Sequence, residues 1–210
     1  MVQKGQFLER PTLIPVGPIV LEGLSHRGTR SPPLLIVPPT PGEGGSMDHV
    51  VAAEAAWAAA TRAFPTLRFN FAGVGGSQGA RGSGAALIPD VEEALRLLLE
   101  NTGAPACVAV SIGGSARTLA EVARRSRQIV GLCFVSPVEI TPEELRDLRL
   151  PLRVIVGALD LRQPRVALAS AVAEAGGRVE IVDDADQTFV KNLAQVGRSI
   201  AEFLMTLEGR

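Results

Sequence analysis

The sequence predicts one α/β domain with a mostly parallel sheet and helices on both of its faces. A chain of 210 residues is long enough for one ordinary domain of this class. Short apolar runs alternate with helical stretches, and the runs lack the alternating polar positions of half-exposed strands. Repeated strand–helix units imply parallel strands joined by right-handed crossovers. We therefore expect residues 1–210 to form a single domain (core about 18–207), with about seven or eight strands.

The expected strands are short and almost wholly apolar. The stretch 13–24 contains Pro15, Gly17 and Pro18, which predicts one or two strands at the edge of the sheet. The later strands are expected at 33–37, 67–71, 107–110, 129–135, 152–156 and 179–182. The carboxyl ends of these strands are where a parallel sheet places its chemistry.

The expected helices follow the strands. Ser46 is a suitable N-cap for the first helix, and Gly176-Gly177 stops the fourth. The last helix has apolar residues at steps of three and four. Thr141-Pro142-Glu143-Glu144 is a capping box that predicts a further short helix. The main helices are expected at 48–63, 90–100, 114–125, 162–175 and 189–207.

Composition excludes several classes of function. With 21 basic and 22 acidic residues, the chain has no electrostatic reason to bind nucleic acid or an anionic membrane. Its apolar runs are too short to span a bilayer, and no secretory signal is visible at the start. Cys107 and Cys133 are too few for a disulfide framework or a structural zinc site. We expect a cytoplasmic protein with no metal and no cofactor.

The chain fits neither of the two common glycine-rich motifs for nucleotide binding. Gly73 and Gly75 would need a third glycine at position 78 to complete a dinucleotide fingerprint, and Gln78 stands there. No Gly-Lys-Ser or Gly-Lys-Thr occurs in the chain, so a phosphate-binding P-loop is absent as well.

The segment 107–114 predicts a nucleophile elbow. A strand runs into Ser111 and then into glycines that open a helix, with Ala109 and Gly113 as the small residues two before and two after the serine. In this interpretation the Ser111 side chain projects above the sheet, and the N–H of Ile112 faces an oxyanion. A plain N-cap serine is the alternative interpretation. Asp160 follows a later strand, and the order serine, acid, final loop is that of an α/β-hydrolase triad.

The chain resembles the small, lidless α/β-hydrolases of the dienelactone-hydrolase and serine-aminopeptidase-like type, in particular a group of uncharacterised bacterial proteins. The resemblance rests on Arg68-Phe69-Asn70-Phe71-Ala72-Gly73-Val74-Gly75-Gly76-Ser77-Gln78-Gly79 and on Gly44-Gly45-Ser46-Met47, and it spans about 18–207. It implies that Ser111 is the nucleophile and Asp160 the acid. It also implies that the N–H groups of Ile112 and Gly42 form the oxyanion hole.

The departures from this family concern its catalytic groups. Gln187 replaces the triad histidine, and Pro38-Pro39-Thr40-Pro41 replaces a loop with two histidines. Gly82-Ser83-Gly84-Ala85 lacks the family's glutamate. Without a base a serine has no useful alkoxide near neutral pH, and glutamine cannot relay a proton.

We therefore expect a catalytically impaired homologue that binds an unknown small molecule or protein, as a monomer or homodimer. One alternative is an active carboxyl-ester hydrolase in which Ser111 uses a substitute base, such as His49 or the substrate itself. Another is an interaction module that dimerises through a sheet edge or its last helix.

Overall fold

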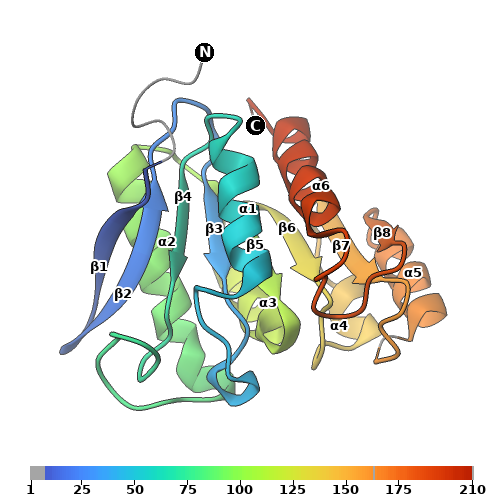
Figure 1. The fold of residues 1–210 in the computed structure, drawn as a ribbon, viewed down its shortest axis with the longest axis horizontal. Helices are drawn as coiled ribbons and strands as arrows, with labels where there is room; N and C mark the ends of the chain where they lie inside the picture. Colours follow the sequence, from blue (N-terminus) through green and yellow to red (C-terminus); the bar gives the residue numbers. More distant parts are fainter. Residues whose placement is uncertain (1–7, 163, 210) are drawn as a thin grey trace.

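The computed structural model describes residues 8–162 and 164–209, and it confirms the predicted fold class. Eight strands form one sheet in the order β1-β2-β4-β3-β5-β6-β7-β8 (Figure 1). β2 is antiparallel to both of its neighbours, and every other pair is parallel. The strands are β1 (Arg10–Val16), β2 (Ile19–His26), β3 (Leu34–Val37), β4 (Thr66–Phe69), β5 (Cys107–Ile112), β6 (Ile129–Val135), β7 (Leu152–Gly157) and β8 (Arg178–Val182).

Helices cover both faces of this sheet, as predicted. α1 (Val50–Ala60) and α6 (Leu193–Thr206) pack together on one face, where they bury one apolar cluster. The helices α2 (Ile88–Thr102), α3 (Ala116–Arg125), α4 (Pro142–Arg146) and α5 (Arg165–Glu174) bury a second cluster on the other face. None of the helices in the described part of the chain has the length and apolar character needed to cross a membrane.

Three of the element boundaries that differ from the sequence-based expectation bear on the candidate site. α5 begins at Arg165, because Pro164 takes the N-cap position in place of a helical residue. α6 begins at Leu193, because Phe189 and Asn192 adopt left-handed backbone angles that no helix tolerates. β5 continues to Ile112, so Ser111 lies inside a strand.

The two edges of the sheet differ in composition. β1 forms one edge and carries Pro11 and Pro15, which have no N–H to offer a further strand. β8 forms the other edge and contains no proline. Both edges flank a centre of buried strands, β3 and β5, that holds the candidate site.

Candidate functional site at the carboxyl edge of the sheet

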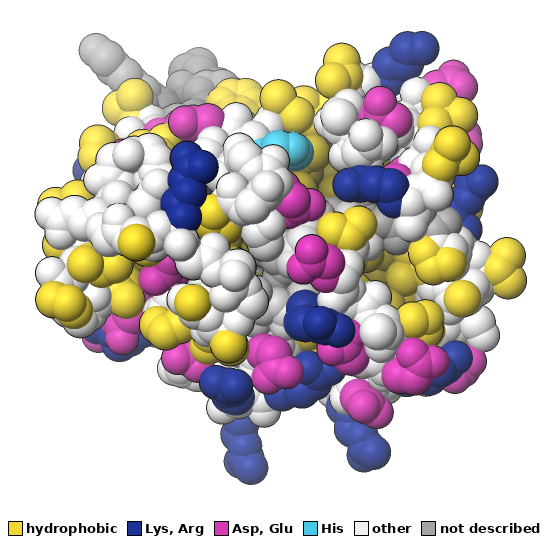
Figure 2. Space-filling view, turned by 90° about the horizontal axis from the view of Figure 1, so that it is seen from below, with side chains coloured by type: hydrophobic (Ala, Val, Ile, Leu, Met, Phe, Trp, Pro, Cys, Tyr) yellow, Lys and Arg dark blue, Asp and Glu magenta, His cyan; other side chains and the backbone are white. Residues whose placement is uncertain are grey.

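The loops that follow the parallel strands gather at the carboxyl edge, as the strand order requires. This edge carries the short helix η1 (Pro41–Glu43) after β3 and the turn η3 (Gly113–Ser115) after β5. The loops after β7 and β8 carry Asp160 and Gln187. Figure 2 looks onto this face and shows acidic side chains near its middle, interspersed with hydrophobic ones.

Ser111 is not at the turn, which corrects the predicted elbow. It pairs with Val37 of β3 and Phe134 of β6 in the middle of the sheet, and its exposed fraction is 0%. Its hydroxyl has no hydrogen-bond partner among the described residues. A side chain buried in this way does not project above the sheet, so the structure does not place Ser111 where a nucleophile meets substrate.

Gly113 makes the turn instead. It has a φ of +62°, the left-handed backbone that a sharp strand-to-helix turn requires. Its carbonyl accepts the N–H of Val138 at 3.1 Å, which ties the turn to the loop after β6. Ser111 and Ser115 are the small residues two before and two after Gly113. The small-x-turn-x-small spacing therefore fits twice in this segment, and the structure places the turn at Gly113 and not at Ser111.

A carboxylate occupies the space in front of this turn. The Oε2 atom of Glu43 accepts the N–H of Gly114 at 2.9 Å, and it also accepts the N–H and hydroxyl of Thr40 at 3.0 Å each. A Cβ added to Gly113 would lie 2.8 Å from Oε1 of Glu43, closer than real Cβ contacts. Glu43 thus fills the place of a side chain at position 113, and no sequence signal indicated this contact across 71 residues.

The N–H groups of Ile112 and Gly42, the predicted oxyanion donors, do not face a common point at the turn in the way the prediction requires. The N–H of Ile112 donates to the hydroxyl of Ser115 at 3.3 Å, inside the turn. Gly42 is exposed within η1, in the same loop as Glu43. The backbone N–H that faces a carboxylate at this turn is that of Gly114, which follows the turn residue directly.

Asp160 lies at the end of β7 and is almost wholly buried. Its carboxylate accepts the hydroxyl of Ser136 at 2.5 Å, and it accepts the N–H and guanidinium of Arg162 at 3.0 to 3.2 Å. Burial by itself would raise the pKa of Asp160, but the hydrogen bonds from Arg162 and Ser136 outweigh it and lower that pKa. Asp160 is an ionised carboxylate that is already paired.

Gln187, at the position of the family's histidine, and His49, the substitute base of the alternative, are the remaining candidate site residues. Gln187 is exposed, and no hydrogen bond joins it to Ser111 or Asp160 within the described ranges. His49 caps the N-terminus of α1, where its Nδ1 accepts the N–H of Val51 at 3.3 Å. Burial lowers the pKa of His49, and the charge of Glu43 offsets part of this effect. His49 is therefore occupied as a helix cap.

The motif that carries the family resemblance holds the loop of Glu43 in place. Arg68 donates to the carbonyl of Met47 and pairs with Glu9 at 2.8 Å and with Asp48 at 3.3 Å. Asn70 accepts the N–H of Met47 at 2.6 Å. The Asn70 amide in turn donates to Glu22 at 2.5 Å. Because these bonds join the end of β4 to the loop after β3, the motif acts as a structural brace.

Solved structures with similar folds cover nearly the whole chain. A protein of unknown function from Agrobacterium tumefaciens, described as a candidate α/β hydrolase, is 22% identical with a TM-score of 0.79, over 95% of this chain and 96% of its own. An α/β serine hydrolase homologue from Coxiella burnetii is 24% identical with a TM-score of 0.80, over 93% and 97%. A lidless α/β serine hydrolase from Xanthomonas campestris is 19% identical with a TM-score of 0.81, over 97% of both chains. No protein-family model and no curated protein matches the sequence.

Proposed function

We propose that this chain, which has the α/β-hydrolase fold, does not hydrolyse esters through a serine nucleophile and acts by binding a ligand or a partner protein. The observation that carries the proposal is Gly113, which makes the turn after β5 with no side chain. A serine hydrolase needs a hydroxyl at such a turn and a base within hydrogen-bond reach of it.

The surroundings of Gly113 support the same conclusion. The Glu43 carboxylate accepts the Gly114 N–H, so a donor that could stabilise an oxyanion already faces a negative charge. Asp160 is paired with Arg162 and Ser136, and Gln187 cannot take up and return a proton. Function resides in the site and not in the fold, and this site lacks each of the three catalytic roles.

Hydrolysis of short p-nitrophenyl esters, together with labelling by a fluorophosphonate, tests the proposal. The proteins to compare are the native chain, Ser111→Ala and Glu43→Gln. We expect all three to hydrolyse at the rate of buffer and to remain unlabelled. Native activity that disappears in Ser111→Ala would establish the active serine hydrolase instead. Activity that disappears only in Glu43→Gln would reveal a carboxylate-dependent reaction and would equally overturn the proposal.

A rebuilt site provides the positive arm of the same experiment. Gly113→Ser combined with Glu43→Ala, Arg162→Ala and Gln187→His places a hydroxyl at the turn, removes the carboxylate, frees Asp160 and supplies a base. We expect this variant to gain fluorophosphonate labelling at position 113. Labelling at Ser111 would show that the register proposed here is wrong.

A further inference from the structure

A cavity of about 680 Å³ lies at the amino edge of the sheet, at the opposite end from the site described above. Its wall is formed by the start of β1, the loop between β2 and β3, the loop before β4, and the end of α2. Near Arg162, at the carboxyl edge, a cavity measures only about 140 Å³. Pockets of 300 to 1,000 Å³ are typical of small-molecule sites, so the cavity at the amino edge has the size of such a site.

The larger cavity has a mixed lining in which the charged side chains are basic. The described lining includes Arg10, His26, Arg27 and Arg30 and contains no aspartate or glutamate. Neither Arg10 nor Arg27 forms an ion pair with any described residue, whereas Arg30 is held by Glu208. Thr29 and Ser31 belong to the same lining and carry hydroxyl groups. The described lining therefore includes two guanidinium groups without a described ion-pair partner and several hydroxyls.

The wall that carries Arg27 is fixed by backbone packing. The N–H groups of Thr29 and Arg30 both donate to the carbonyl of Ala63, at 2.8 and 3.0 Å. A Cβ added to Gly28 would lie 2.3 Å from the same carbonyl, so this loop lies directly on the end of α1. The Arg30 guanidinium lies 4.6 Å from the centre of the Phe64 ring. Because this wall is fixed before binding, no binding free energy is lost in ordering the loop.

The C-terminus of α2 also borders the cavity, and its partial negative charge would oppose an anion. Two of its last carbonyls are already satisfied. The Gly103 N–H donates to the Leu99 carbonyl at 2.8 Å, and the Thr102 hydroxyl donates to that of Leu98 at 2.8 Å. The guanidinium groups of Arg10 and Arg27 are the full charges in the described lining that have no described ion-pair partner.

We infer that this cavity binds a small phosphorylated, hydroxyl-rich molecule, with Arg10 and Arg27 as the groups that pair with the phosphate. Guanidinium groups match phosphate oxygens in a bidentate geometry, and the hydroxyl and amide side chains among the mixed lining can hydrogen-bond a sugar-like body. The inference concerns a different end of the molecule from the candidate catalytic site, and it does not depend on whether that site hydrolyses esters.

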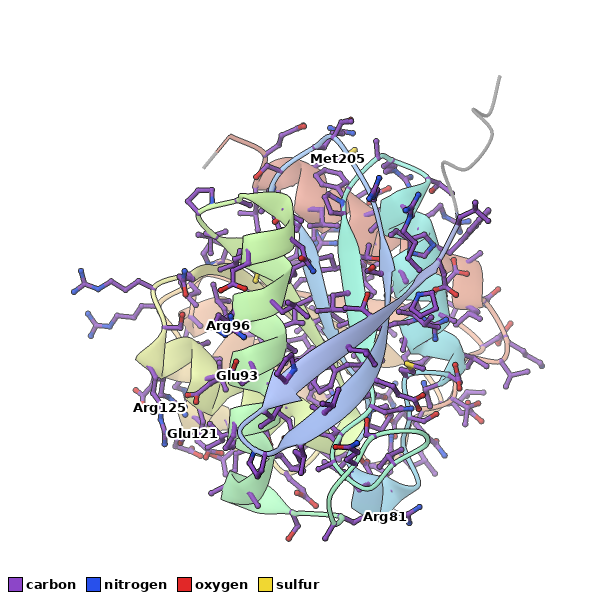
Figure 3. The ribbon with its side chains drawn as sticks, turned by 90° about the vertical axis from the view of Figure 1, so that its left-hand side faces the viewer. Arg81, Glu93, Arg96, Glu121, Arg125 and Met205 are labelled. Carbon is purple, nitrogen blue, oxygen red and sulfur yellow. The ribbon has the colours of Figure 1, made fainter. Side chains whose placement is uncertain are left out.

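Isothermal titration calorimetry with glucose 6-phosphate, glucose, inorganic phosphate and citrate tests the inference. We expect glucose 6-phosphate to bind more tightly than inorganic phosphate, and glucose not to bind. Arg10→Gln and Arg27→Gln should each weaken binding by about tenfold, which corresponds to about 1.4 kcal/mol. The matched control is Arg81→Gln, which removes an exposed arginine at the opposite end of the molecule, as Figure 3 shows, and should leave the affinity unchanged.

Three outcomes would overturn the inference. The first is no heat with any phosphate probe, and the second is equal binding of citrate and glucose 6-phosphate. The third is equal weakening by Arg81→Gln and Arg27→Gln, which would mean that binding follows overall charge. Amide NMR shifts in native protein must also fall on residues 25–31 and 101–104. Shifts confined to the carboxyl edge would assign the phosphate to the other site and would reject this one.

Discussion

The carboxyl edge of the sheet contains two groups of residues that differ in what their side chains do. One is the brace formed by Arg68 and Asn70, in which each polar group has a partner that fixes the loop after β3. The other is the set of candidate catalytic positions, where Gly113 has no side chain and Asp160 is paired with Arg162. The comparison teaches that the stabilising contacts of a motif can be complete where the neighbouring turn carries no side chain.

The largest expected effect is on the brace. Arg68→Met removes a buried guanidinium and leaves the Met47 carbonyl and the Glu9 carboxylate without their donor. We expect a loss of about 2–3 kcal/mol in the free energy of unfolding, measured by urea denaturation. Arg96→Met is the matched control, because Arg96 forms its ion pairs on the exposed surface of α2 (Figure 3). It should cost less than about 1 kcal/mol. Equal losses would mean that the brace has no special role.

The next effect tests whether Glu43 occupies the space beside Gly113. Gly113→Ala should cost about 1–2 kcal/mol for the left-handed backbone, and more for the contact with Glu43. Gly176 has a φ of +74° with open space around it, so Gly176→Ala measures the backbone cost alone. The excess at Gly113 should disappear when Glu43→Ala is added. A cost that is the same in both backgrounds would contradict the placement of Glu43.

A smaller effect, of opposite sign, distinguishes the two registers of the elbow. Because the buried Ser111 hydroxyl has no described partner, Ser111→Ala should stabilise the protein by about 1 kcal/mol. Ser115→Ala should destabilise it by a similar amount, since the Ser115 hydroxyl donates to the Ile112 carbonyl at 2.9 Å. Thermal melts of both variants suffice. Destabilisation by Ser111→Ala would imply a partner for its hydroxyl and would reopen its candidacy as a nucleophile.

The smallest effect concerns pH and His49. Burial lowers the pKa of His49 in the folded state below its unfolded value of about 6.5. The unfolded chain therefore binds more protons as the pH falls below 7, and stability falls with it. His49→Asn keeps an N-cap and removes this titration. We expect the variant to lose less stability than native protein between pH 7.5 and 5.5, in paired denaturation curves. Parallel pH profiles would show that His49 contributes nothing in this range.

The fold could be predicted from the sequence because its signals are local. Apolar runs without alternation gave the parallel strands, and the capping box at Thr141 gave the start of α4, whose hydrogen bonds are present. The site could be predicted only in part. The small-residue rule at the elbow is satisfied both around Ser111 and around Gly113, and only the structure shows that the turn lies at Gly113.

The contacts that decide the site are not local. Glu43 lies 71 residues from Gly114, and its carboxylate reaches the turn only because β3 and β5 are neighbours in the sheet. Arg162 looked like the start of a helix in the sequence, yet its guanidinium turns back onto Asp160. Periodicity and spacing in the sequence do not predict which groups the side chains of Glu43 and Arg162 contact. The replacement of the family's histidine by Gln187, which the resemblance implies, rests by contrast on a single position.

The prolines of β1 have a consequence for assembly. A strand can be added to a sheet only where the outer edge offers free N–H and carbonyl groups, and Pro11 and Pro15 remove donors from the β1 edge. The β8 edge carries no such block. If two copies joined their sheets through β8, each outer margin of the combined sheet would be a proline-bearing β1. Growth by strand addition would then stop at the dimer. Further growth would require pairing through the β1 edge, where the prolines remove the N–H donors.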